Sequence, residues 1–233
     1  MVSSPPWQVL KDRAATIVDR QGFEHVEETA LDPLFWAHVT EILNFTKPIY
    51  HMIRFADTDK PVIGEVYEQM DSMLGKIKDV VKDNDPNLYA MIHDCVCAWW
   101  NKLNVPLHAL AYILMPKYYS PSWLGQPAPG GGVKIKPHTD PKVQDGYMKA
   151  LDNLVPHKAK CANLRLELVR YFNCTRVFGS LHAMEDRGRF DALTWWEAYG
   201  GMGLLPKLAK KSSLTSCKYF FYREVLEHLQ LHT

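Results

Sequence analysis

The chain has 233 residues, of which 47% are apolar and 23% are charged, with a formal net charge of +1. This composition is that of an ordinary globular protein, and the length allows one large domain or two small ones. The small net charge excludes a bulk electrostatic field that attracts nucleic acid or an anionic membrane. Neither a secretory signal nor an apolar stretch of membrane-spanning length is visible, so we expect a soluble, intracellular protein with no membrane partner.

The first part of the chain shows helical periodicity. An apolar stripe predicts a helix over residues 7–20, within an N-terminal helical extension of residues 1–31. Asp32 and Pro33 then give the N-cap and first-turn signals of a second helix, in which we expect a kink at Pro48. Further helices are predicted over residues 62–82, 86–100 and 106–120.

Proline and glycine dominate residues 121–141, where the glycines at 130–132 lack the spacing of a phosphate-binding loop. We interpret this segment as a flexible linker between a helical domain, residues 32–120, and a helical C-terminal region, residues 142–233. Helical patterns return over residues 143–154, 159–172, 192–199, 204–211 and 219–231. Because no alternating strand pattern occurs, the predicted fold class is mostly α.

The segment from His93 to Cys97, followed by His108, contains residue types that bind metals. Zinc sites usually take Cys-x-x-Cys pairs from turns. Cys95 and Cys97 are instead two residues apart in a helical pattern, which points their side chains to different sides of the helix. The five cysteines are also scattered, so we predict reduced thiols, no metal and no cofactor, with His108 packed at a helix start.

Residues 137–141, Pro-His-Thr-Asp-Pro, resemble the iron-binding His-Thr-Asp string of plant 2-oxoglutarate oxygenases. That family places the string among barrel strands and adds a later histidine and an Arg-x-Ser, whereas here it leads into a helix. The simpler interpretation is that Asp140 and Pro141 start the next helix. An iron-dependent oxygenase that uses His138 and Asp140 stays open as an alternative.

Two adjacent tryptophans, Trp195 and Trp196, occur in a short helical pattern. Neighbouring positions on a helix point to different sides, so we expect that at least one ring packs on another element or another chain. Tryptophan and tyrosine are enriched at protein interfaces, although most such residues belong to cores. The pattern therefore leaves core and interface open.

Several short blocks follow one another in a fixed order. They are Asn44–Tyr50, Ile53–Asp57, Gly64–Asp71, Pro106–Tyr112, Met115–Tyr119, Phe178–Gly179, Trp195–Trp196, Tyr199–Gly200, Leu205–Pro206 and Leu208–Ala209. In this order they resemble the C-terminal part of plant hAT-superfamily transposases, from about Asp32 onward. The resemblance implies a helical insertion-type domain followed by a partial RNase H-like region that ends in a dimerisation segment. To that segment it assigns Trp195, Trp196, Tyr199, Leu205 and Leu208.

The resemblance also implies what the chain lacks. These transposases cut and join DNA with three acidic residues that hold two metal ions. Two of the three align upstream of the matching part of this chain. In an ungapped alignment Phe220 occupies the position of the third, and Glu224 aligns with it only if a gap is introduced. The implied protein is a truncated, catalytically inactive derivative, nuclear or nucleo-cytoplasmic, with weak or no direct DNA binding. Its expected partners are a second copy or a transposase-related chain.

Two further alternatives stay open beside this interpretation. A nuclease is conceivable if Asp140, Asp145 and Glu224 come together in the folded chain. The second alternative is that the chain is a transposon relic with no selected function.

Overall fold

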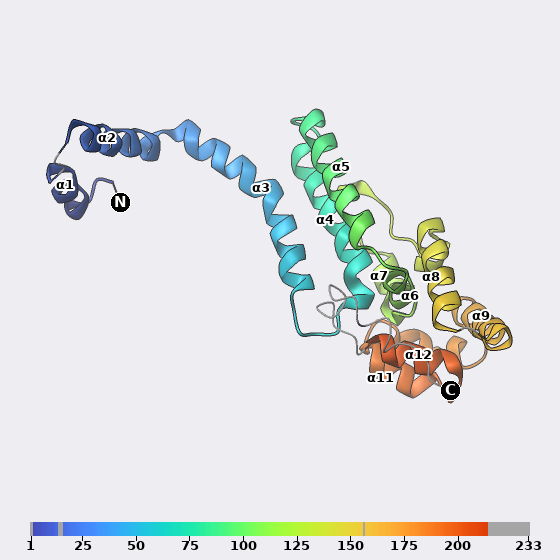
Figure 1. The fold of residues 1–233 in the computed structure, drawn as a ribbon. Helices are drawn as coiled ribbons and strands as arrows, with labels where there is room; N and C mark the ends of the chain where they lie inside the picture. Colours follow the sequence, from blue (N-terminus) through green and yellow to red (C-terminus); the bar gives the residue numbers. More distant parts are fainter. Residues whose placement is uncertain (1, 14–15, 156, 214–233) are drawn as a thin grey trace. The chain divides into compact units, whose positions relative to one another are not determined.

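The computed structural model describes residues 2–13, 16–155 and 157–213 (Figure 1). This part of the chain contains helices and no strand, which confirms the prediction of a mostly α fold. Backbone contacts divide the chain into two compact units, Met1–Lys47 (unit 1) and Pro48–Thr233 (unit 2). None of the described helices combines the length and the apolar character that a membrane crossing requires.

Unit 1 is built from helices that begin at clear local signals. They are α1 (Pro5–Asp12), α2 (Ile17–Leu31) and the first part of α3 (Pro33–Ala56). As predicted, Asp32 precedes α3, and its carboxylate accepts a hydrogen bond of 2.9 Å from the Leu34 N–H. Pro48 lies inside α3, which continues through it to Ala56.

The single helix predicted over residues 7–20 is wrong, because α1 ends at Asp12 and a new helix begins at Ile17, with Thr16 as its N-cap. The Thr16 hydroxyl accepts a hydrogen bond of 3.1 Å from the Asp19 N–H, and the Asp19 carboxylate accepts one of 3.2 Å from the Thr16 N–H. This reciprocal pair is a capping box, which satisfies two backbone donors at the start of α2. A local cap therefore outweighs the continuous apolar stripe.

Few side chains hold unit 1 together. The Trp7 and Phe23 rings meet edge to face with centroids 5.2 Å apart, and Lys11 pairs with Glu27 at 2.7 Å. No described residue of α1, α2 or α3 is buried. Unit 1 therefore has no hydrophobic core within the described residues.

Unit 2 is an assembly of short helices joined by tight connections. Its further α-helices are α4 (Val66–Val81), α5 (Pro86–Leu103), α6 (Pro106–Ile113), α7 (Pro121–Leu124), α8 (Pro141–Leu154), α9 (Lys158–Phe172), α10 (Leu181–Asp186), α11 (Ala192–Tyr199) and α12 (Leu204–Ser213). Single turns of 3-10 helix lie between them: η1 (Ile63–Glu65), η2 (Pro116–Tyr119), η3 (Pro129–Gly131), η4 (Pro137–Thr139) and η5 (Arg176–Gly179).

Helix α6 lies at the centre of unit 2. Every residue from Leu107 to Ile113 is buried, and the helix packs against α8, α4 and η1. A side chain at Gly146 of α8 would place its Cβ 2.6 Å from the Cβ of Ala109, so the glycine permits the close approach of α6 and α8. His108 is buried at the start of α6, which confirms the prediction of a packed histidine.

The interpretation of residues 121–141 as a flexible linker is wrong. The Gly130 N–H donates a hydrogen bond of 2.9 Å to Asp79 of α4, and Lys134 pairs with Glu68 of α4 at 2.8 Å. Both side chains of the ion pair are largely buried. Polar groups on one face of α4 therefore dock this glycine-rich segment along the helix.

The expected division between residues 32–120 and 142–233 is also not observed. Helices on both sides of the docked segment share one core, because α6 packs on α8 and α12 packs on η1 and α6. The Trp196 indole N–H of α11 donates a hydrogen bond of 2.8 Å to the carbonyl of Leu114, at the end of α6. The contacts place a boundary between residues 47 and 48 instead.

Replacing Gly75 with alanine is expected to lower the free energy of unfolding by about 1–3 kcal/mol, as overpacking does. Alanine normally stabilises a helix interior relative to glycine, by about 0.5–1 kcal/mol. At Gly75 of α4, however, a Cβ would lie 2.4 Å from the Pro129 carbonyl oxygen of the docked segment. Urea denaturation followed by circular dichroism measures the change.

Gly22→Ala in α2 is the matched control, because no atom lies within 4 Å of a Cβ at that position. This substitution is expected to stabilise its helix. A gain in stability from Gly75→Ala would contradict the docking of residues 129–131 against α4.

Candidate functional site

Both tryptophans of α11 are buried within the chain, with 0% of either residue exposed. The Trp195 indole N–H donates a hydrogen bond of 2.9 Å to the Ala183 carbonyl, and that of Trp196 bonds to Leu114. Their rings meet at 86° with centroids 5.1 Å apart. Both rings pack on other elements of the same chain, since α11 contacts α10, α12 and η2, which is one of the two possibilities that the sequence left open.

The other residues of the predicted dimerisation segment behave similarly. Leu205 and Leu208 of α12 are buried, and only Tyr199 reaches the surface, where its hydroxyl donates a hydrogen bond of 2.5 Å to Asp186. Four of the five residues therefore build the core of unit 2. Their role as an interface stays a prediction that now depends on Tyr199 alone.

Arg187 lies at 0% exposure in the same aromatic cluster. Its guanidinium carbon is 4.7 Å from the ring centre of Tyr171 and 5.3 Å from that of Trp195, and Nη2 donates a hydrogen bond of 3.1 Å to the Tyr171 carbonyl. A guanidinium keeps its charge when buried, and aromatic faces stabilise it. No sequence signal indicated this contact, because the partners come from separate helices.

The proposed iron ligands His138 and Asp140 have structural contacts. The His138 ring stacks on Phe172 with centroids 4.3 Å apart. The Asp140 carboxylate accepts hydrogen bonds from the N–H groups of Lys142, at 2.7 Å, and Val143, which confirms that Asp140 caps the next helix. Burial lowers the pKa of His138. Among the described ranges, no group of three or more histidine, cysteine, aspartate or glutamate side chains has an arrangement that could hold a metal ion.

The described residues do not show the carboxylates of the nuclease alternative gathered in one site. Asp145 is exposed on α8 and pairs with Lys149 one turn later at 2.6 Å. Phe220 and Glu224, on which the catalytic comparison depends, lie outside the described residues. Catalytic inactivity therefore stays a prediction from the sequence.

A cavity of about 280 Å³ lies between α4, α6 and the docked segment. Tyr67, Tyr112 and Trp123 give it aromatic walls, and Asp71 and Asp140 give it carboxylates. Although Asp71 is exposed as a residue, desolvation of its carboxyl group and the nearby charges of Glu68 and Asp140 raise its pKa to about 6. The cavity is acidic, and the ion pair of Lys134 with Glu68 neutralises part of its charge.

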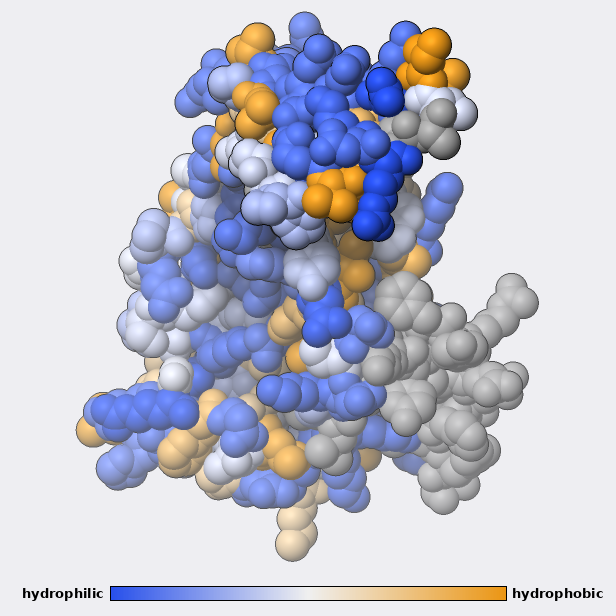
Figure 2. All heavy atoms as spheres, turned by 90° about the vertical axis from the view of Figure 1, so that its left-hand side faces the viewer, coloured by the Kyte–Doolittle hydropathy of each residue, from blue (hydrophilic) through white to orange (hydrophobic). Residues whose placement is uncertain are grey.

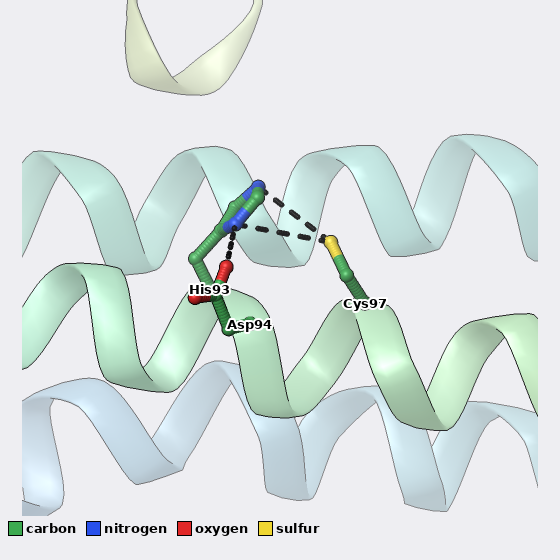
Figure 3. Close-up of polar contacts among 3 residues, drawn as sticks. All are labelled: His93, Asp94 and Cys97. Atoms are coloured by element: carbon green, nitrogen blue, oxygen red, sulfur yellow. Dashed lines mark hydrogen bonds and ion pairs between the residues drawn. The ribbon is translucent and has the colours of Figure 1, made fainter.

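Helix α5 brings His93 and Cys97 together, one helical turn apart (Figure 3). The Cys97 Sγ lies 3.5 Å from Nε2 and 3.9 Å from Nδ1 of the His93 ring. Nδ1 of the same ring lies 3.3 Å from an Asp94 carboxylate oxygen. The metal hypothesis rested on Cys95 and Cys97, whereas the spacing of four residues between His93 and Cys97 on a helix predicts this contact.

No match to this chain was found among known protein families, curated proteins or solved structures.

Proposed function

We propose that this protein works by self-association and not by catalysis, as a nuclear or nucleo-cytoplasmic derivative of a hAT-type transposase. The order of the sequence blocks supports the ancestry. The observation that carries association is the uncovered apolar surface of unit 1, whose helices bury no residue.

The unit 1 apolar surface is made of large side chains at the end of α2 and along α3. Its members are Leu31, Leu34, Phe35, Trp36, Ile42 and Leu43, which are between 38% and 68% exposed. Figure 2 shows apolar side chains in orange that reach the surface among hydrophilic ones. Soluble monomers rarely expose this many large apolar groups in one short stretch, and such surfaces mark interaction sites.

The exposed area is of the right size for an interface. With roughly 200 Å² for each fully exposed large side chain, the surface offers on the order of 600 Å². Specific interfaces bury roughly 600–1,000 Å² on each partner. Covering this area with a partner therefore supplies the hydrophobic burial that unit 1 lacks.

The arrangement of these side chains fits a helical partner. Phe35 and Ile42 are seven residues apart, as are Trp36 and Leu43, so they form two neighbouring rows along α3. A repeat of seven residues is the pattern by which two helices pack side by side. A second copy of this chain supplies the same rows, and two-fold dimers are the commonest oligomers.

Leu43→Asp is expected to weaken the dimer by about 10–100-fold in Kd, because burial of a leucine contributes about 1.5–3 kcal/mol. Sedimentation velocity of the full chain, with EDTA and a reductant present, measures the change. Asn44→Asp is the matched control, because it adds the same charge at the next exposed position of α3 and removes no apolar group. A wild-type chain that is monomeric at tens of micromolar contradicts the proposal, as does equal dissociation of both variants.

A further inference from the structure

The cavity between α4, α6 and the docked segment combines two features that favour a positively charged ligand. The rings of Tyr67, Tyr112 and Trp123 line it, and so do the carboxylates of Asp71 and Asp140. Aromatic faces attract cations, and carboxylates supply the opposite charge. The volume of about 280 Å³ is close to the lower limit of small-molecule sites, which is about 300 Å³. The cavity therefore suits a small organic cation.

The ammonium group of Lys134, which belongs to the chain itself, already lies in surroundings of this kind. Its Nζ is 4.5 Å from the ring centroid of Trp123 and 2.8 Å from a carboxylate oxygen of Glu68. The Lys134 side chain is only 10% exposed, so both contacts form largely away from water, where a cation gains most from an aromatic ring. One ring and one carboxylate of the cavity wall thus hold an ammonium group in the folded chain.

Asp71 is a carboxylate of the cavity that has no such partner. Within the described part of the chain, no group forms a hydrogen bond or an ion pair with it. The charges of Glu68 and Asp140 repel its ionised form, and the charge of Lys142 opposes that repulsion. Asp140 differs from it, because its carboxylate accepts the backbone N–H groups that start α8. A cation bound beside Asp71 would relieve the repulsion between the carboxylates.

The aromatic walls favour a methylated ammonium group over a metal ion or a primary amine. The Tyr67 and Tyr112 rings lie nearly parallel, with centroids 5.4 Å apart, and both line the cavity. Metal ions bind to oxygen, nitrogen or sulfur donors, and a primary amine needs acceptors for its N–H groups. A fully methylated ammonium group has no N–H donor, and it is recognised by aromatic faces.

We propose that this cavity binds a methylated ammonium group, with Asp71 as its counterion and with Tyr112 and Trp123 as its aromatic walls. Such a group occurs on free molecules and on methylated lysine side chains, which share this chemistry. Binding is reversible and breaks no bond. The site lies in unit 2 and goes beyond the proposed self-association, which depends on unit 1.

The test is a titration of the full chain with choline at slightly alkaline pH, where Asp71 is ionised. Saturation-transfer NMR of the choline methyl protons is expected to show one saturable site with a Kd on the order of 1 mM. The alcohol 3,3-dimethylbutanol has the shape of choline without its charge and should not show saturable binding. Asp71→Asn and Trp123→Leu should each weaken choline binding by about tenfold.

Asp145→Asn controls for the loss of charge, because Asp145 is exposed on α8 and does not line the cavity. It is expected to leave the affinity for choline unchanged. A trimethyllysine peptide that binds more tightly than choline assigns the cation to a protein, and one that binds more weakly assigns it to a free molecule. No saturable binding of choline, equal binding of dimethylbutanol, or equal effects of Asp71→Asn and Asp145→Asn would overturn the proposal.

Discussion

Trp196→Ala is expected to lower the free energy of unfolding by about 3–5 kcal/mol, the range for truncation of a buried aromatic side chain. Trp196 is fully buried, and its ring centroid lies 4.9 Å from that of Tyr171. Its removal also leaves the Leu114 carbonyl without the indole donor, and an unsatisfied buried acceptor costs about 1–3 kcal/mol. Urea denaturation monitored by circular dichroism measures the loss.

Trp99→Ala is the control for this prediction, because Trp99 is 58% exposed on α5. Its effect is expected to be within about 0.5 kcal/mol, as for other surface substitutions. If Trp196→Ala dissociates a dimer while helicity and unfolding midpoint stay those of the wild type, Trp196 is an interface residue and the burial described for α11 is wrong.

Acidification from pH 6.5 to pH 4 is expected to destabilise the chain through His108 by on the order of 3 kcal/mol. Burial lowers the pKa of His108 from 6.5 to about 4, and its Nδ1 accepts a hydrogen bond of 3.2 Å from the Val105 N–H. The unfolded chain keeps the ordinary pKa and therefore binds the proton first as pH falls. The contribution of neutral His108 is complete above pH 6.5 and is lost as the pH approaches 4.

His108→Gln isolates this effect, because glutamine at the third helical position can accept the same backbone hydrogen bond without titrating. The difference in unfolding free energy between wild type and His108→Gln should change by on the order of 3 kcal/mol between pH 7 and pH 4. His51→Gln, at an exposed position of α3, should follow the wild-type profile. Parallel profiles for wild type and His108→Gln would show that the histidine is not buried in its neutral form.

Helix starts were predictable from the sequence where the cap is local. Asp32, Asp85 and Asp140 each precede a proline, and each carboxylate accepts a hydrogen bond from a backbone N–H two or three residues later. Such a contact needs only the few residues around it, so the sequence contains all the information. The break at Thr16 has the same local cause and was missed because the apolar stripe was given more weight than the cap.

The candidate site was only partly predictable. The contact of His93 with Cys97 follows from a spacing of four residues on a helix and could have been found from the sequence. The exposure of the pair depends on what covers α5, which no local pattern states. The unit 1 apolar surface was likewise not predictable, because an apolar stripe indicates that a helix face is buried but does not indicate which element or chain covers it.

The sequence by itself determined that the chain is helical and where several helices begin, since periodicity and caps act within one or two turns. Only the tertiary structure decided that both Trp195 and Trp196 are buried, because their covers come from η2, α10 and α12. It likewise decided that residues 129–134 dock on α4, since Gly75 and Asp79 precede them by some fifty residues. Burial and docking depend on which distant surfaces meet, and that is a property of the whole packed chain.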